Sequence, residues 1–80
     1  MSPTSFLRLP EVMRRRGRGR SANYKDIVEG FLTEPIAIGR QSVAWPEHEV
    51  EAINRARLAG KSADEIKQLV RDLHAARKAA

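Results

Sequence analysis

The chain has 80 residues, of which 15 are Lys or Arg and 10 are Asp or Glu, and it contains no cysteine. A chain of this length makes one domain with a modest core, so a large enzyme cleft is not expected. The lack of cysteine excludes disulfides, thiolate zinc sites and thiol nucleophiles. No apolar run approaches the roughly 18 residues of a membrane span, and the N-terminus lacks a signal-peptide pattern, so we expect a cytoplasmic protein.

The net charge of +5 is concentrated at one end of the sequence. Residues 1–25 hold seven basic side chains and one acid, Glu11, a balance of +6. Residues 26–80 hold eight basic and nine acidic side chains, a balance of −1. A local excess of this kind is typical of a surface that binds a polyanion.

Short elements are predicted in the first quarter of the chain. Residues 1–5 are expected to form a flexible tail, and the alternation of apolar and basic residues over 7–9 suits a short strand. Pro10 favours the first turn of a helix, which we expect to cover residues 10–16. Two glycines within 17–19 then predict a tight turn.

A second helix is predicted from Ser21, a candidate N-cap, to about Gly30. Its apolar residues recur at i, i+3, i+4 and i+7, which predicts a buried stripe of Tyr24, Ile27, Val28 and Phe31. Tyr24 is therefore interpreted as a core residue with its hydroxyl at the rim, in preference to a platform on which bases stack.

Residues 36–38 and 43–45 alternate in the manner of strands, so they predict a hairpin. The tip between them carries Arg40 and Gln41 and is basic and polar. Trp45 is interpreted as a core anchor, because a single tryptophan on a strand is most often buried.

Two further helices complete the chain. Pro46 starts the first, which Gly60 ends, and its predicted inner face consists of Val50, Ile53 and either Ala56 or the stem of Arg57. Ser62 and Glu65 form a capping-box pattern, so the last helix is expected from there to about Lys78. Its predicted apolar stripe consists of Ile66, Leu69, Val70 and Leu73.

This order of elements predicts a mostly α-helical fold with a small β-hairpin wing. Two short helices joined by a glycine turn and followed by a hairpin form a winged helix-turn-helix of the excisionase or MerR-like kind, here with an extended C-terminal helix. We expect a DNA-binding domain over residues 6–59 and a C-terminal amphipathic helix over 60–80, for packing or oligomerisation.

Double-stranded DNA is the partner that this fold and charge indicate. The second helix would enter the major groove, the arginines before it would hold phosphates, and the hairpin tip would reach the adjacent minor groove. About six phosphate contacts predict a loss of roughly a thousandfold in affinity between 50 and 200 mM salt. The candidate DNA-binding residues are Arg14, Arg15, Arg16, Arg18, Arg20, Ser21, Ala22, Lys25, Arg40 and Gln41.

No motif indicates catalysis or a cofactor. The sequence has no glycine-rich phosphate loop, no interpretable carboxylate pair and no nucleophile near a histidine, so we expect no enzymatic activity. His48 and His74 lack the neighbouring ligands of a metal site. RNA binding is disfavoured because few aromatic residues are present to stack on bases.

A set of residues in unbroken order resembles the AlpA family of phage and prophage regulators. The set is Leu7-Arg8-Leu9-Pro10-Glu11-Val12-Met13, Gly17, Arg20-Ser21, Tyr24, Glu29-Gly30, Pro35, Ile38-Gly39, Val43 and Trp45. The C-terminal part, through Ala52-Ile53-Asn54, Ala59-Gly60-Lys61-Ser62 and Ala75-Ala76-Arg77-Lys78, is similar to a longer subset of that family. The chain departs from the family pattern at Arg18 and Asn23, where leucine and an apolar residue are usual, and both departures bear on which way the second helix faces.

The resemblance implies an excisionase-like winged fold and two overlapping activities. Members regulate transcription of prophages and integrative elements, and some are recombination directionality factors that bend attachment-site DNA for a tyrosine recombinase. It also implies that Arg20, Ser21, Ala22 and Lys25 face DNA and that Arg40 lies at the wing tip. The expected partners are therefore attachment-site and promoter DNA and an integrase, and the expected location is the bacterial nucleoid.

The last helix has two interpretations. It could mediate head-to-tail contacts between copies on DNA through Leu69, Val70 and Leu73, or the same stripe could belong to the chain's own core. An alternative for the whole protein is an adaptor or antirepressor, in which the basic stretch contacts an acidic surface of a recombinase or polymerase.

Overall fold

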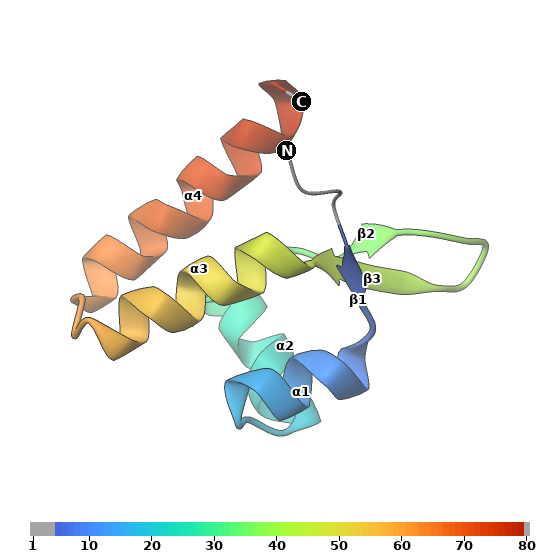
Figure 1. Cartoon of the computed structure of the whole chain (residues 1–80), viewed down its shortest axis with the longest axis horizontal. Coiled ribbons are helices and arrows are strands. Elements are labelled where there is room, and N and C mark those ends of the chain that lie inside the picture. Colours follow the sequence, from blue (N-terminus) through green and yellow to red (C-terminus); the bar gives the residue numbers. More distant parts are fainter. Residues whose placement is uncertain (1–4, 80) are drawn as a thin grey trace.

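A computed structural model describes residues 5–79, which form four helices and a small antiparallel sheet (Figure 1). The predicted tail therefore lies outside the described residues, except for Ser5. The elements in chain order are β1 (Phe6–Leu7), α1 (Leu9–Arg16), α2 (Arg20–Glu29), β2 (Ile36–Ala37), β3 (Val43–Pro46), α3 (Glu47–Leu58) and α4 (Ala63–Ala79). This order confirms the predicted fold class, mostly α-helical with a small hairpin wing.

The helix-turn-helix is formed by α1 and α2, and glycines end both helices. Gly17 has φ +65° and its N–H donates to the carbonyl of Met13 at 2.9 Å, while Gly30 ends α2 with φ +88°. These left-handed conformations favour glycine, which is why the sequence located both ends correctly. The predicted cap at Ser21 is wrong: α2 begins one residue earlier, at Arg20, and Gly19 occupies the cap position with no side chain to accept a hydrogen bond.

The wing is the hairpin of β2 and β3, and β3 is the central strand of the sheet, in the order β1-β3-β2. Leu7 pairs with Trp45 and Ile36 pairs with Ala44, so the wing is attached to the start of α1. The predicted alternation on the second strand is only partly correct, because Ala44 and Trp45 are both buried while Val43 is exposed. Trp45 is a core anchor as predicted, fully buried, and its indole N–H donates to the carbonyl of Thr33 at 2.9 Å.

One hydrophobic core contains residues of the sheet and of α1, α2, α3 and α4. α3 crosses the middle of the molecule, with α1 and α2 on one side of it and α4 on the other (Figure 1). The buried members of the core are Leu7, Val12, Leu32, Trp45, Val50, Ile53 and Val70, with Leu9, Ile27, Leu69 and Leu73 packed against them. The core therefore fixes the direction of α1, α2 and the wing relative to one another.

α4 packs against its own domain along its whole predicted stripe. Ser62 and Glu65 form the expected reciprocal capping box, at 3.0 and 3.2 Å. Ile66 and Val70 are buried, and Leu69 and Leu73 contact the core cluster. The structure thus favours the intramolecular interpretation of Leu69, Val70 and Leu73, and a contact between copies through these residues stays a prediction without support.

Two polar contacts hold the far end of α4. The guanidinium of Arg77 pairs with the carboxylate of Glu49, whose side chain is 1% exposed, at 2.6 Å. His74 accepts a hydrogen bond from the backbone N–H of Glu34 at 3.0 Å, so this histidine has a structural contact. Within residues 5–79, no helix combines the length and the apolar character needed to cross a membrane.

Candidate nucleic-acid interface

The inward face of α2 is polar, which corrects the predicted apolar stripe. Asn23 and Asp26 are buried, whereas Tyr24 is 41% exposed and Val28 is 86% exposed. Only Ile27 and Phe31 of the predicted stripe are partly buried. The prediction that Tyr24 is a core residue is therefore wrong, and α2 turns a different face outward than the hydrophobic pattern indicated.

Asn23 and Arg18, the two departures from the family pattern, contact each other in the structure. The side-chain amide of Asn23 donates to the carbonyl oxygens of Arg18 and Gly19, at 3.0 and 2.9 Å. The guanidinium of Arg16 donates in turn to the amide oxygen of Asn23 at 2.5 Å. Asn23 thus satisfies carbonyls of the turn between α1 and α2 and fixes where α2 begins.

The carboxylate of Asp26 lies close to three arginines. It lies 3.1 Å from Arg16, 2.8 Å from Arg18 and 3.9 Å from Arg57. The side chain of Arg16 is only 1% exposed. Burial lowers the pKa of Arg16, and the charge of Asp26 opposes that effect by favouring the charged guanidinium.

Arg16 therefore cannot reach a DNA backbone, and its predicted role as a phosphate contact is corrected to a structural one. A buried charge is tolerated when an opposite charge lies beside it, whereas an unpaired buried charge strongly destabilises the folded protein. Arg18 is 36% exposed and has the same carboxylate partner. Its predicted phosphate contact would therefore compete with the ion pair to Asp26.

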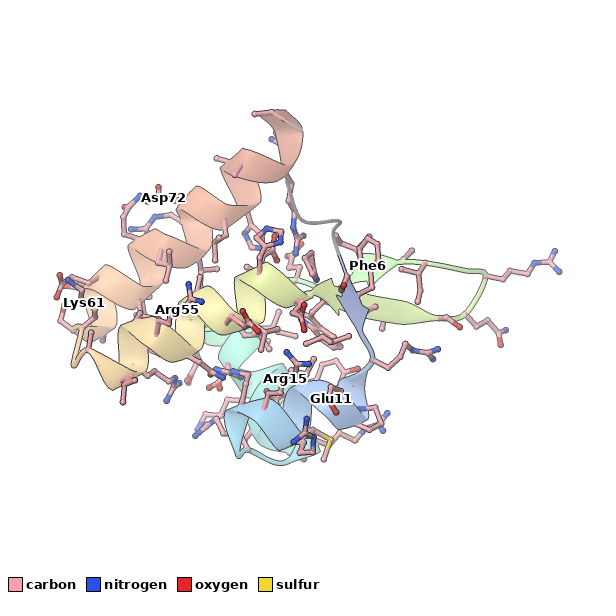
Figure 2. The ribbon with its side chains drawn as sticks, in the orientation of Figure 1. Phe6, Glu11, Arg15, Arg55, Lys61 and Asp72 are labelled. Carbon is pink, nitrogen blue, oxygen red and sulfur yellow. The ribbon has the colours of Figure 1, made fainter. Side chains whose placement is uncertain are left out.

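Arg15 also forms ion pairs with carboxylates. It pairs with Glu11, Glu47 and Glu51 at 2.8, 2.7 and 3.3 Å, and Figure 2 shows it beside Glu11 in the space between α1 and α3. The side chain is 27% exposed. Arg15 therefore joins α1 to α3, and its predicted role as a phosphate contact is not favoured.

Arg14 is the most accessible arginine of α1, at 71%, although it pairs with Glu11. Hydrogen bonds from Arg14 and then Arg15 lower the pKa of Glu11 to about 2. The same carboxylate raises the pKa of both arginines. At neutral pH this carboxylate offsets one of the three positive charges that the sequence concentrates in α1.

Among the described residues, seven Lys or Arg side chains pair with no carboxylate. Lys67, Arg71 and Lys78 lie on α4, and the other four lie around the start of α2 and the wing. Among residues 5–79, no ion pair involves Arg8, Arg20, Lys25 or Arg40, and all four side chains are exposed. A hollow of about 350 Å³ brings Arg8 and the start of α2 to the wing. Its lining includes Arg8, Arg20, Tyr24 and Gln41.

We name this surface the α2–wing face and define it by Arg8, Arg20, Ser21, Tyr24, Lys25, Arg40 and Gln41. The guanidinium of Arg20 lies 6.0 Å from the centre of the Tyr24 ring, within the range of a cation–π contact. Ala22, a predicted DNA contact, is half-buried and lies off this surface.

Sequence reasoning missed Arg8 and Tyr24 as members of the face. Arg8 was counted only in the charge balance, and its position beside α2 depends on the pairing of β1 with β3. Tyr24 and Lys25 follow Ser21 at i+3 and i+4, so the sequence also allows a stripe that joins Tyr24 to polar residues. The apolar neighbours Ile27 and Phe31 gave it a competing interpretation.

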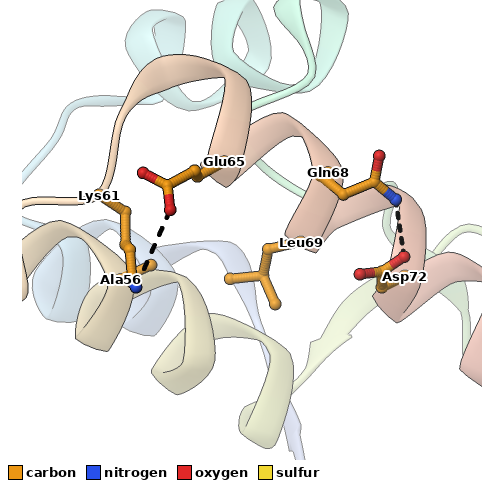
Figure 3. A pocket seen from close by; sticks show the side chains of 6 residues that line it. All are labelled: Ala56, Lys61, Glu65, Gln68, Leu69 and Asp72. Carbon is orange, nitrogen blue, oxygen red and sulfur yellow. Dashed lines mark hydrogen bonds and ion pairs between the residues drawn. The ribbon is translucent and has the colours of Figure 1, made fainter.

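A second hollow, of about 330 Å³, lies between α3 and α4 (Figure 3). Its polar side chains pair with one another: Lys61 lies 3.9 Å from Glu65, and Gln68 donates to Asp72 at 2.8 Å. These pairs leave no concentrated charge for a ligand. Among the described residues, no group of three or more His, Asp or Glu side chains is placed to hold a metal ion.

Comparison with known proteins gives a family. The profile of the family described as "Prophage CP4-57 regulatory protein (AlpA)" matches residues 5–58, which contain α1, α2, the wing and α3. Over 56 residues the chain is 41% identical to "Uncharacterized protein ORF88" of Enterobacteria phage P4, a match that covers 70% of this chain and 64% of that relative. No solved structure matches the chain. The match over residues 5–58 shows that the chain belongs to the AlpA family of phage regulatory proteins.

Proposed function

We propose that the protein binds double-stranded DNA in a sequence-selective manner and thereby regulates an integrated phage or related mobile element. The observation that carries the proposal is the separation of the basic residues between positions 8 and 40 into two groups. Arg15, Arg16 and Arg18 are held by carboxylates, whereas the cations of the α2–wing face are not. Membership of a family of prophage regulators supports a regulatory role.

The face suits the docking of a winged helix-turn-helix. α2 would lie in the major groove with Arg20, Ser21 and Lys25 near base edges, where arginine or lysine commonly contacts guanine. Arg40 and Gln41 at the wing tip would reach the adjacent minor groove, which attracts arginine where it is narrow. Arg8 and Arg14, at the two ends of α1, would contact phosphates.

The finer role that we propose is that of a recombination directionality factor. Such a protein binds adjacent sites, bends attachment-site DNA and thereby directs a tyrosine recombinase toward excision. Membership of a family of prophage regulators supports this role, and the similarity to a phage P4 protein supports a phage context. Promoter binding by the same face would account for transcriptional control.

A competition gel shift tests the proposal. Duplexes from the attachment site and promoter of the protein's own element are titrated with wild-type protein and with Arg20→Ala and Lys25→Ala, against random duplex of equal length. Losing a bidentate base contact should cost about 1–3 kcal/mol of discrimination, or roughly five- to 150-fold. Arg55→Ala is the matched control, because Arg55 is 80% exposed on α3 and lies outside the face.

Each outcome of the competition experiment is informative. Selective binding that Arg20→Ala and Lys25→Ala weaken, and that Arg55→Ala leaves intact, supports the α2–wing face as the DNA-binding surface. Equal losses from all three variants would contradict the assigned roles. Absence of any preference between the duplexes would overturn the proposal in favour of an adaptor that contacts an acidic protein surface.

A further inference from the structure

The outward side of α2 carries an apolar residue that the core does not use. Ser21, Tyr24, Lys25 and Val28 follow one another at i, i+3, i+4 and i+7, so they form one continuous helical stripe. Asn23 and Asp26, both buried, define the opposite side of the helix. Val28 therefore lies on the same stripe as the members of the α2–wing face that approach DNA.

Val28 is 86% exposed, about twice as exposed as Tyr24, while its neighbour Ile27 packs against the core. A branched aliphatic side chain at this position contributes nothing to the folded core. In the major groove the only apolar group on a base edge is the C5-methyl of thymine, and aliphatic side chains contact it. The aliphatic side chain of Val28 is therefore chemically suited to contact a thymine methyl group.

We propose that Val28 recognises the C5-methyl group of a thymine in the bound site. The inference rests on the proposed function and names one base that the α2–wing face reads. Val28 lies seven positions after Ser21, which corresponds to about 10 Å along the helix axis. Successive base pairs of duplex DNA are about 3.4 Å apart along the DNA axis, so the thymine lies within about three base steps of the base that Ser21 or Arg20 contacts.

The test removes the two contacting groups separately and together. A preferred duplex is first selected from a random pool with wild-type protein, and each thymine in it is then replaced in turn by deoxyuridine, which lacks only the methyl group. At one thymine, wild-type affinity should fall about fourfold, the effect of removing one buried methyl group from an apolar contact. Val28→Ala should lower affinity for the intact duplex by a similar or larger factor and should be insensitive to deoxyuridine at that same position.

Leu58→Ala is the matched control, because Leu58 is 90% exposed and apolar but lies at the end of α3. This variant should keep the wild-type response to deoxyuridine. Val28→Ala should have the same thermal midpoint as wild type, since the side chain packs against no core residue.

The results separate this inference from the function on which it rests. Selection of a preferred duplex, with Val28→Ala keeping full sensitivity to every deoxyuridine, would overturn the thymine contact and leave the proposed function intact. A Val28→Ala variant that loses only cooperative binding to adjacent sites would assign the residue to a contact between copies, and would also overturn the inference. If wild-type protein selects no sequence, both proposals fail together.

Discussion

Replacing Asp26 by asparagine should destabilise the protein more than any exposed substitution. The change keeps the size of the side chain but removes the negative charge that faces Arg16, whose side chain is 1% exposed. Breaking a buried ion pair by removing one partner costs about 3–5 kcal/mol, because the remaining charge has no solvent to replace its partner. In a domain of this size, the midpoint of thermal unfolding should fall by at least about 12 °C.

The measurement is urea unfolding and thermal melting, followed by circular dichroism. Asp72→Asn is the matched control, because Asp72 is exposed on α4 and accepts a hydrogen bond from the neighbouring side chain of Gln68, so its effect should be within about 0.5 kcal/mol. If Asp26→Asn leaves the protein unfolded, Arg16→Met combined with Asp26→Leu should restore part of the stability. The double variant removes the buried charge together with its partner, and its remaining deficit is the amide oxygen of Asn23, which loses its donor. An Asp26→Asn variant as stable as Asp72→Asn would refute the structural role assigned to Arg16.

Three further predictions follow from contacts in the core and at the ends of the helices. Trp45→Phe should cost about 1–3 kcal/mol in urea unfolding, because the buried carbonyl of Thr33 loses its donor; a cost below that of an exposed substitution would contradict this contact. Glu11 contributes stability above its unfolded pKa of about 4.5, and this contribution is lost as the pH falls toward about 2, so Glu11→Gln should flatten thermal stability over that interval relative to wild type. Arg77→Met should speed amide hydrogen exchange in α4 more than in α1, because the buried carboxylate of Glu49 loses its partner; equal rates in wild type and variant would rule out that role.

The sequence predicted the order of elements and most of their ends, because those depend on local signals. Gly17 and Gly30 end helices with positive φ, and Ser62 with Glu65 caps α4, and each of these patterns lies within a few consecutive residues. Trp45 was also predicted correctly, since burial of a single tryptophan on a strand is common.

The facing of α2 could not be predicted from its own residues. An apolar stripe and a polar one compete within this helix. The polar side with Asp26 is buried because Arg16 and Arg57, from α1 and α3, supply opposite charge to its carboxylate. A pattern within one helix holds no information on such partners. The same reason explains why the sequence overestimated the basic surface: Arg15 is neutralised by Glu47 and Glu51, which are more than 30 residues away.

The dependence of DNA affinity on salt concentration, measured by fluorescence anisotropy of a labelled duplex, shows whether the unpaired cations of the α2–wing face bind DNA. Arg8, Arg20, Lys25 and Arg40 are the four cations of the α2–wing face. Four released counterions predict a slope of about −3.6 in log K against log salt, or a loss of about 150-fold between 50 and 200 mM salt. A phosphate contact by Arg14 would bring the slope to about −4.5 and the loss to about 500-fold, still below the roughly thousandfold loss expected when the other paired arginines are counted. Arg40→Ala should reduce the slope by about 1 and Arg55→Ala should not, because Arg55 lies outside the face. A slope near zero, or an equal reduction in both variants, would contradict DNA binding by the cations of the α2–wing face.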